Sequence, residues 1–246
     1  TTEESDASAV LYDVYNAGQI GDDTYTYYAR HVGGVAGRLS GHIEKAYNTG
    51  DIYNYDTTVG GIAGWWYNGT ISNVFNTGNI TVRTNTEMQV GGIVGSSSPL
   101  AQSLSYAYNL GTIRGFQEGH KDHWTWADIF VGGIIGRARG GGVSIDNVYT
   151  LGNLYAATGT YNATTGGIYT KVGADSGLGA IYGGTDKPTL SNANYITPEN
   201  PTDGTPTFND LSRQAETQGI NVVAYDKKSN ADAEPVAFLK RGSCGP

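Results

Sequence analysis

The residues best suited to chemistry lie in one short segment, 118–128, whose sequence is Glu-Gly-His-Lys-Asp-His-Trp-Thr-Trp-Ala-Asp. It contains two of the four histidines and two of the four tryptophans in the chain. His120 and His123, with Asp122 or Glu118, are suitable ligand types for a metal ion. No second spaced cluster accompanies them, and no helical pattern would hold their geometry. We therefore predict no metal and no other cofactor.

The same segment suits carbohydrate better than metal. Trp124 and Trp126 would offer flat apolar faces to sugar rings, beside the hydrogen-bond acceptors Asp122 and Asp128. A purely structural interpretation is also open and is favoured, because a segment with two tryptophans usually buries at least one of them against the fold. The segment remains the first candidate for a ligand-binding site.

Two further aromatic segments are predicted to be loops. One is Trp65-Trp66-Tyr67, and the other is the tyrosine-rich stretch 22–28. Exposed aromatic patches indicate recognition surfaces. The candidate ligand-binding residues are therefore Trp124, Trp126, His120, His123, Asp122, Asp128, Trp65, Trp66 and Tyr67.

Composition argues against several functions. The net charge is −8 and only 15% of residues are charged. The basic runs Lys227-Lys228 and Lys240-Arg241 are too short to bind nucleic acid. The 23 acidic residues are scattered, and no nucleophile-elbow motif marks a serine. We therefore expect no nucleic-acid partner, no catalytic residues and no enzyme.

The single cysteine excludes an internal disulfide. Cys244 is either a free thiol or a contact to another chain or to a cysteine outside this sequence. No apolar run approaches eighteen residues, so no membrane insertion is predicted. The sequence begins at Thr1 without a methionine or an apolar signal segment, and we expect it to be an excised or processed piece of a larger protein.

Two short words recur along the chain with a period near thirty residues. The first is aromatic-Asn-x-Gly-x-Ile, at Tyr15–Ile20, Tyr47–Ile52, Phe75–Ile80 and Tyr108–Ile113, and more loosely at Tyr149–Leu154. The second is Val-Gly-Gly-Ile/Val-x-Gly, starting at Val32, Val59, Val90 and Val131, with a degenerate copy at Thr165–Ile168. Such a period indicates a stacked repeat array.

The elements within one repeat are predicted to be short strands. In the stretch 59–82, Val59–Gly64, Thr70–Phe75 and Asn79–Val82 are β-prone, and Trp65–Gly69 is predicted to be a turn or loop. Three short strands with Gly/Asn corners are typical of a parallel β-solenoid. The predicted fold is all-β: a right-handed parallel β-solenoid (β-helix) of about five to six coils, about 4.8 Å apart.

The repeat predicts columns of equivalent residues. Two aliphatic columns should fill the interior: Val35, Ile62, Ile93, Ile134 and Ile168, and Ile20, Ile52, Ile80, Ile113 and Leu154. Asn16, Asn48, Asn76 and Asn109 should form an amide ladder. The glycine two residues later should adopt a left-handed conformation. The aromatic column either points inward after a bend, which is favoured, or forms an exposed stack.

The repeats stop near Tyr195, so we predict two regions, 1–195 with the solenoid repeats and 196–246 as a small C-terminal cap. The stretch 208–218 could form a short helix, while Ile220–Tyr225 and Pro235–Leu239 should be strands. A terminal segment that covers the open edges of an array is expected.

The two words together resemble the Glug motif. The matching stretches are Gly60–Gly64 with Ile71–Ile80, and Gly91–Gly95 with Leu104–Ile113, and the resemblance extends over roughly 11–154. Such repeats occur in large secreted bacterial surface proteins, including filamentous-haemagglutinin-like adhesins, and in non-catalytic parts of immunoglobulin-A-cleaving metallopeptidases. The resemblance implies a secreted or cell-surface location and transfers no catalytic residue.

Three functions follow as hypotheses. The first is a non-enzymatic segment of a bacterial surface adhesin, a rod whose loops bind host-cell or extracellular-matrix ligands, glycans among them. The second is the non-catalytic β-solenoid region of a large secreted protease. The third is a carbohydrate-active β-helix enzyme, which would need two carboxylates facing one groove.

Overall fold

The computed structural model of the chain describes residues 9–22, 24, 29–118, 129–152, 154–159, 177–179, 181–183, 188–197 and 222–226. These residues form an all-β structure of parallel strands in curled sheets, without a helix among them. No described helix is therefore long and apolar enough to cross a membrane. The predicted all-β class and the predicted parallel pairing are confirmed.

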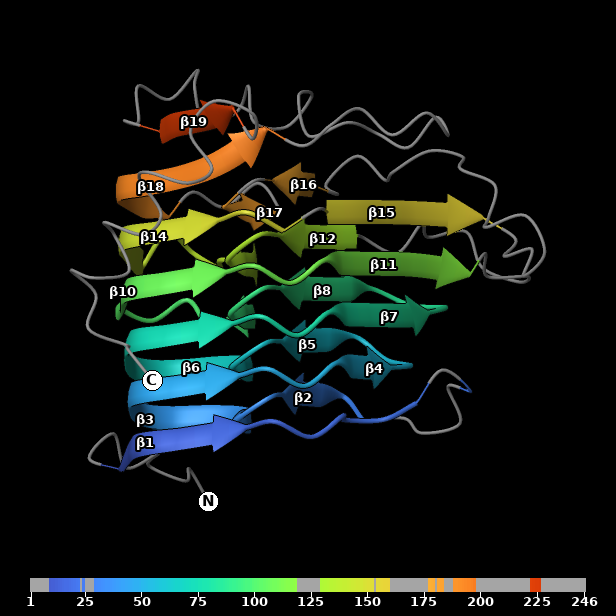
Figure 1. The fold of residues 1–246 in the computed structure, drawn as a ribbon, viewed down its shortest axis with the longest axis horizontal. Coiled ribbons are helices and arrows are strands. Elements are labelled where there is room, and N and C mark those ends of the chain that lie inside the picture. Colours follow the sequence, from blue (N-terminus) through green and yellow to red (C-terminus); the bar gives the residue numbers. More distant parts are fainter. Residues whose placement is uncertain are drawn as a thin grey trace.

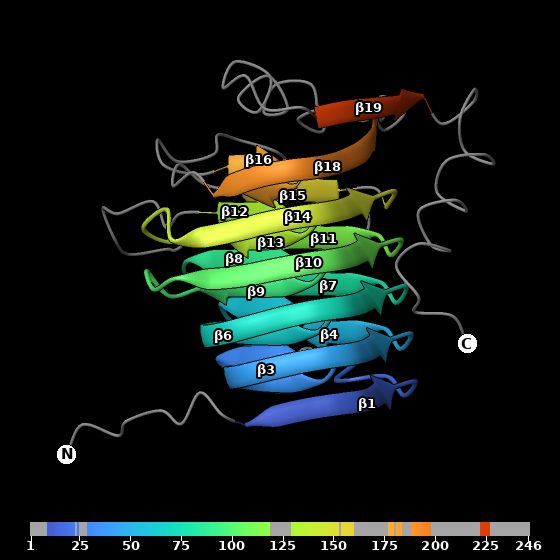
Figure 2. The same ribbon diagram turned by 90° about the vertical axis from the view of Figure 1, so that its left-hand side faces the viewer.

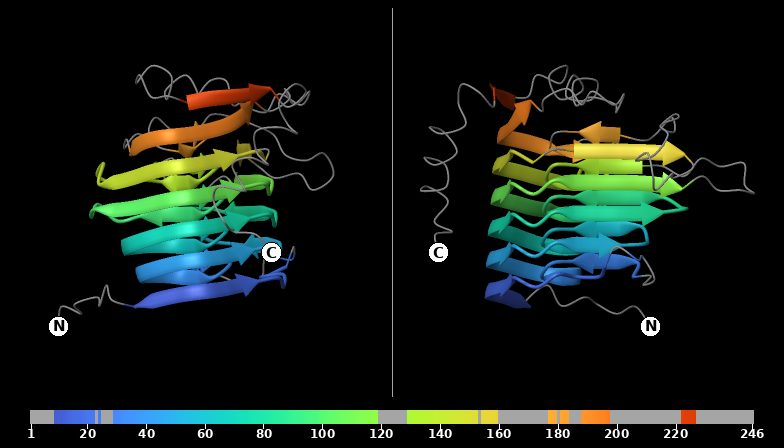
Figure 3. Two further views of the ribbon diagram at one scale, coloured as in Figure 1. Left: turned by 60° about the vertical axis from the view of Figure 1, so that its left-hand side comes forward. Right: turned by 45° about the vertical axis from the view of Figure 1, so that its right-hand side comes forward.

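The strands stack in rows, and each complete interior repeat adds one strand segment to each row (Figure 1). The broad row in Figure 2 comprises β1 (Val10–Asn16), the second halves of β3 (Ala36–Asn48) and β6 (Ala63–Asn76), then β10 (Gln102–Asn109), β14 (Val143–Thr150), β18 (Thr189–Thr197) and β19 (Val222–Asp226). The second row, prominent on the right of Figure 3, comprises β4 (Ile52–Asn54), β7 (Ile80–Thr84), β11 (Ile113–Glu118) and β15 (Leu154–Gly159).

Two further rows complete the repeat. One comprises β2 (His31–Gly33), β5 (Thr58–Gly60), β8 (Met88–Gly91), β12 (Ile129–Gly132) and β16 (Gly177–Gly179). The other comprises the first halves of β3 and β6, then β9 (Val94–Ser97), β13 (Ile135–Arg137) and β17 (Tyr182–Gly183). A full repeat therefore has four strand segments where the sequence predicts three, because the run Val59–Gly64 is split at Gly61 and Ile62.

The predicted loop at Trp65–Gly69 is wrong. These residues lie inside β6, where Trp65 and Trp66 pair in register with β3 on one side and β9 on the other. The local Asn-Gly signal produces an irregularity rather than a loop: Trp66 pairs with Leu39, Asn68 pairs with Ser40, and the register shifts between them. Pairing on both sides satisfies the backbone and overrides the turn preference.

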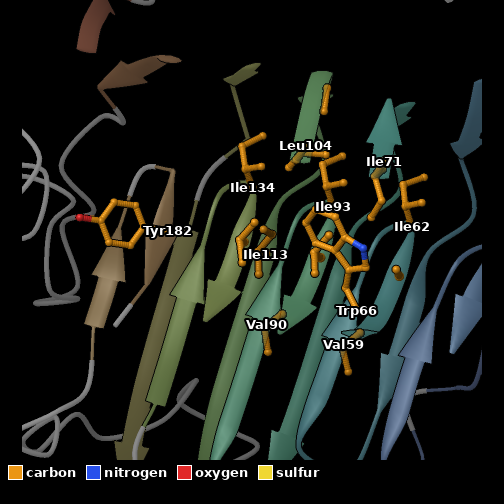
Figure 4. Close-up of a cluster of buried hydrophobic side chains, with 14 of the residues drawn as sticks. Val59, Ile62, Trp66, Ile71, Val90, Ile93, Leu104, Ile113, Ile134 and Tyr182 are labelled. Atoms are coloured by element: carbon orange, nitrogen blue, oxygen red, sulfur yellow. The ribbon is translucent and has the colours of Figure 1, made fainter. Parts of the chain in front are cut away.

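The interior is filled by the two aliphatic columns. Ile52, Ile80 and Ile113 are fully buried in register. Ile62, Ile93 and Ile134 are also fully buried, and Figure 4 shows these three together with Ile113. At the ends of these columns Leu154 is buried, whereas Ile20 and Val35 are partly buried against the core. Figure 4 also shows the Trp66 indole lying among these aliphatic side chains.

The fifth copy of the glycine word is not where the sequence predicts it. Val131 pairs with Leu178, Gly132 with Gly179 and Ile135 with Tyr182. The backbone N–H of Ile134 donates to the oxygen of Ile181 at 2.9 Å, so Ile181 takes the place predicted for Ile168. The word at this level is therefore 178–183, Leu-Gly-Ala-Ile-Tyr-Gly. The predicted copy at Thr165–Ile168 lies outside the described residues.

The asparagine column forms the predicted amide ladder. Asn16 Nδ2 donates to Asn48 Oδ1 at 2.7 Å, Asn48 to Asn76 at 2.7 Å, and Asn76 to Asn109 at 2.8 Å. Each Nδ2 also donates to the carbonyl oxygen of the glycine two residues later, as Asn76 does to Gly78 at 2.8 Å. At the next level Thr150 replaces asparagine and accepts from Asn109 Nδ2 at 3.5 Å. The ladder therefore satisfies buried polar groups along one corner of the array.

The prediction that the corner glycines are left-handed is wrong. The described glycines with positive φ are Gly21, Gly41, Gly69, Gly140 and Gly141, and none belongs to an Asn-x-Gly word. A Cβ added at Gly78 would instead lie 2.0 Å from the oxygen of Gly50 in the preceding repeat. Glycine is required at this corner because neighbouring backbones approach too closely for any side chain.

The two words recur together because they touch each other. A Cβ added at Gly61, the second glycine of its word, would lie 2.6 Å from Cγ of Asn76. The same distance is 2.6 Å between Gly34 and Asn48, and 2.5 Å between Gly92 and Asn109. The glycine pair thus makes room for the amide ladder of its own repeat.

The aromatic column stacks face to face outside the hydrophobic core cluster. Ring centroids from Tyr15 through Tyr47, Phe75 and Tyr108 to Tyr149 are 4.8–5.0 Å apart, with interplanar angles of 2–7°. The expected bend is present, because Asn73 and its equivalents have φ of 51–54°. This bend brings both Ile71 and Val74 into the core despite their opposite parity, while the ring that follows Val74 stacks with its equivalents.

Parts of the C-terminal region are described. Strand β19 (Val222–Asp226) overlaps the predicted strand Ile220–Tyr225 and pairs with β18. The predicted helix at 208–218, the predicted strand Pro235–Leu239 and Cys244 lie outside the described residues. The division into repeats and cap remains a prediction.

Candidate functional site

The nine sequence-predicted site residues divide into two groups. Trp65, Trp66 and Tyr67 belong to the described strand β6. The others, His120, Asp122, His123, Trp124, Trp126 and Asp128, lie outside the described residues. The described structure therefore bears on the site only through Trp65 to Tyr67.

Trp66 is a core residue. Its side chain is fully buried, and its Nε1 donates to the backbone oxygen of Asn68 at 2.9 Å. Its own backbone oxygen accepts from the amide of Gln102 at 2.8 Å. A side chain without exposed surface cannot contact a ligand, so Trp66 holds the fold and is not a recognition residue.

Trp65 lies at the centre of a surface cluster of aromatic and charged groups. The Arg139 guanidinium carbon lies 5.2 Å from the Trp65 ring centroid, a cation–π distance. The His31 ring lies on the same tryptophan at 5.5 Å between centroids, tilted by 42°. Arg38 is the register partner of Trp65 in the preceding repeat. We call His31, Arg38, Trp65, Glu87, Arg137 and Arg139 the Trp65 cluster.

Stacking of the repeats brings these residues together. The Cα register runs from Arg38 to Trp65, then to Ser96 and Arg137. Ser96 is fully buried between its two large neighbours. Because serine is small, long side chains from adjacent positions can extend between the Trp65 ring and Arg137.

One carboxylate orients the two outer arginines. Arg137 Nη1 donates to Glu87 Oε1 at 2.6 Å, and Arg139 Nη2 lies 3.7 Å from the same oxygen. The Arg137 guanidinium carbon also lies 4.4 Å from the Phe130 ring centroid. The cluster holds three guanidinium groups against one carboxylate, so it is locally positive on a chain with a net charge of −8. Such a surface favours anionic ligands.

The environment of His31 disfavours its charged form. Burial of the ring, followed by the charges of Arg38 and Arg30, lowers the pKa of His31 below its usual value, and Asp56 opposes the shift in part. Its Nδ1 is buried and has no hydrogen-bond partner among the described residues. The lowered pKa disfavours the imidazolium, and the ring packs against Trp65.

Tyr67 is exposed, and the contact described for it is with Gln102 rather than with the Trp65 cluster. Its side chain is 41% exposed, and it lies at the register shift between Trp66 and Asn68. Its backbone oxygen accepts from the Gln102 amide at 2.9 Å. The predicted Trp65-Trp66-Tyr67 aromatic patch is therefore wrong as one surface, because its middle residue is part of the core.

His31, Arg38, Glu87, Arg137 and Arg139 were not predicted from the sequence. A signal for two of them exists: the residue directly after the last glycine of each glycine word forms one column, and it is Arg38, Trp65, Ser96 and Arg137. The residue type differs along this column, from arginine through tryptophan and serine to arginine. Glu87 and Arg139 carry no comparable signal, because only side-chain reach brings them to Trp65.

The Trp65 cluster combines an aromatic ring with positive charge. An indole can stack on a sugar ring, and the guanidinium groups beside it can pair with a carboxylate or sulfate on that sugar. No group of three or more His, Cys, Asp or Glu residues suited to a metal ion occurs among the described residues.

Comparisons with protein-family models, curated proteins and solved structures find no match for this chain.

Proposed function

We propose that the chain is a non-enzymatic segment of a secreted bacterial surface adhesin. In this proposal the stacked repeats form a right-handed parallel β-solenoid rod of about five to six coils. The rod carries a binding surface for anionic carbohydrate of the host cell or its matrix, formed by the Trp65 cluster. The segment 118–128 is a second contact in the same proposal.

The continuous register of the repeats carries the rod part of the proposal. The ladder from Asn16 to Asn109 runs without interruption, and the aromatic stack follows the same repeats as far as Tyr149. Each repeat contacts its neighbours through the backbone, so the array is stiff along its axis. A stiff rod that holds surface groups away from its anchor suits an adhesin.

The Trp65 cluster supports the ligand class. Trp65 provides an apolar face, and Arg38, Arg137 and Arg139 provide an excess of positive charge next to it. Uronic acids and sulfated sugars combine a ring for stacking with an anionic group for guanidinium. Neutral sugars would use only the first of these features.

A glycan array that includes neutral, uronic-acid and sulfated sugars tests the proposal. Wild type should bind the anionic sugars, and the binding should weaken as salt rises, because exposed charges are screened. Trp65→Ala should lower the affinity about tenfold or more, as expected for loss of a central aromatic contact. Trp124→Ala/Trp126→Ala measures the contribution of the second contact independently.

The matched control is Tyr106→Asn. Tyr106 is 42% exposed on β10 and lies outside the Trp65 cluster, and asparagine tolerates its φ of 52°. This variant should bind like wild type. If no glycan binds, or if Trp65→Ala and Tyr106→Asn behave alike, the cluster is not the binding surface.

A further inference from the structure

The β1 end of the array exposes residues that the interior repeats bury. Leu11 is 38% exposed, whereas Ile43 and Ile71, its equivalents in the next two repeats, are fully buried. Val10, Tyr12 and Tyr15 on the same strand are also exposed. Among the described strands β1 pairs with β3 on one side only. The apolar columns of the array are therefore open at this end.

All the asparagine side chains of the amide ladder donate in the same direction. Asn16 is the first of them, so its side-chain oxygen is the acceptor at the β1 end. Each Nδ2 donates towards the C-terminal neighbour, so Asn48 Oδ1 accepts from Asn16, and Asn76 Oδ1 from Asn48. Among the described residues, Asn16 Oδ1 accepts only a long 3.3 Å bond from the N–H of Gly18 in its own word. This oxygen faces the position from which a preceding asparagine would donate.

The contacts of Gly18 with the described residues do not explain why this position is a glycine. Cβ atoms added at Gly50, Gly78 and Gly111 would each lie 1.9–2.0 Å from a glycine oxygen of the preceding repeat. Among the described residues, a Cβ added at Gly18 would meet only Asn16 Oδ1, at an ordinary 3.7 Å. Its φ is not positive, so backbone conformation does not explain it either. A backbone approaching from the open side does explain it.

We propose that the β1 end is a docking surface for one more repeat of the same kind. That repeat stacks parallel on β1 and places an aromatic-Asn-x-Gly corner above Tyr15, Asn16 and Gly18. It continues the ring stack on the open face of Tyr15, which is 65% exposed, and donates an amide to Asn16 Oδ1. It also buries Leu11. This inference is independent of the proposed adhesin function.

The occupant is a preceding repeat of the same array rather than a second copy of the chain. A second copy would have to offer its opposite end to continue the parallel columns. There β18 has Asn194 in register with Tyr149, and Tyr195 in register with Thr150. Strand β19 then pairs with β18 on its outer side. That end does not present the Asn-x-Gly word that Asn16 and Gly18 fit.

The test adds a repeat in register. Because Val10 pairs with His42, and His42 with Thr70, a copy of residues 42–69 joined directly ahead of Val10, in place of residues 1–9, positions its asparagine above Asn16. In the full chain, Gly18→Ala should leave the thermal midpoint unchanged or raise it, since it removes only unfolded-state freedom. In the extended chain it should lower the midpoint as much as Gly78→Ala does, about 4 °C or more.

A scrambled copy of the same 28 residues is the matched control, and Gly18→Ala should remain tolerated there. As a second measurement, amide hydrogen exchange in Val10–Asn16 should slow about tenfold or more with the in-register copy and not with the scrambled one. The proposal is overturned if Gly18→Ala is tolerated in the extended chain and exchange is unchanged. It is also overturned if the full chain forms a dimer that Tyr15→Glu dissociates, which would assign the surface to a second copy.

Discussion

Removing one central rung of the amide ladder should destabilise the whole array. Asn76 is fully buried and makes three side-chain hydrogen bonds: its Nδ2 donates to Gly78 O and to Asn109 Oδ1, both at 2.8 Å, and its Oδ1 accepts from Asn48 Nδ2 at 2.7 Å. In Asn76→Ala all three are lost.

The magnitude follows from the groups left behind. The oxygens of Gly78 and Asn109 would lose a buried donor, which costs about 1–3 kcal/mol for each unsatisfied group. Asn48 Nδ2 keeps its bond to Gly50 O at 2.8 Å, so its share is smaller. The two oxygens together account for about 2–6 kcal/mol, which lowers the thermal midpoint of a domain of this size by about 4–24 °C.

Thermal and urea unfolding followed by far-ultraviolet circular dichroism measure this effect. Asn16→Ala is the control, because its rung lies at the exposed end, where water replaces the lost partners, and it should cost less than about 1 kcal/mol. Asn76→Thr should fall between the two, since Thr150 occupies a ladder position naturally. Equal midpoints for Asn76→Ala and Asn16→Ala would refute the idea that the ladder stabilises the fold.

Three further predictions concern Trp66, Tyr149 and Glu87. Trp66→Ala should lower the unfolding free energy by about 3–5 kcal/mol in urea titrations, since the indole is fully buried. Burial, with a smaller contribution from Tyr108, raises the pKa of Tyr149. The neutral phenol therefore favours the folded state up to the unfolded pKa of about 10. Above that pH stability should fall, and Tyr149→Phe should reduce the fall in midpoints measured from pH 8 to 11. Glu87→Gln should change stability by less than about 1 kcal/mol, because its ion pairs are partly exposed, yet strengthen anionic-glycan binding measured by titration.

The repeat columns could be predicted from the sequence because each column depends on a local pattern. Ile52, Ile80 and Ile113 recur at the same place in a word, so stacking one repeat on the next buries them together. The same argument predicts the ladder from Asn16 to Asn109, since identical amides at one spacing satisfy each other. The contact between Gly61 and Asn76 was not predicted, although it explains why the two words recur together.

The candidate site was only partly predictable. Trp65 and Trp66 are adjacent and chemically identical, yet one lies on the surface and the other in the core, because successive residues of a strand face opposite sides. An assignment to a loop hides this alternation. Arg139 reaches Trp65 from two repeats further along the array, a distance in sequence that no local pattern encodes.

The repeat, its parallel columns and the all-β class could be predicted from the sequence because they follow from residue types at a constant spacing. The tertiary structure alone decided that Leu178–Gly183 forms the fifth copy, that the corner glycines clear a neighbouring backbone, and that Trp65 gathers arginines around it. The physical reason is common to all three. Register, close approach and side-chain reach are properties of two chains in contact, and they exist only once the repeats are stacked.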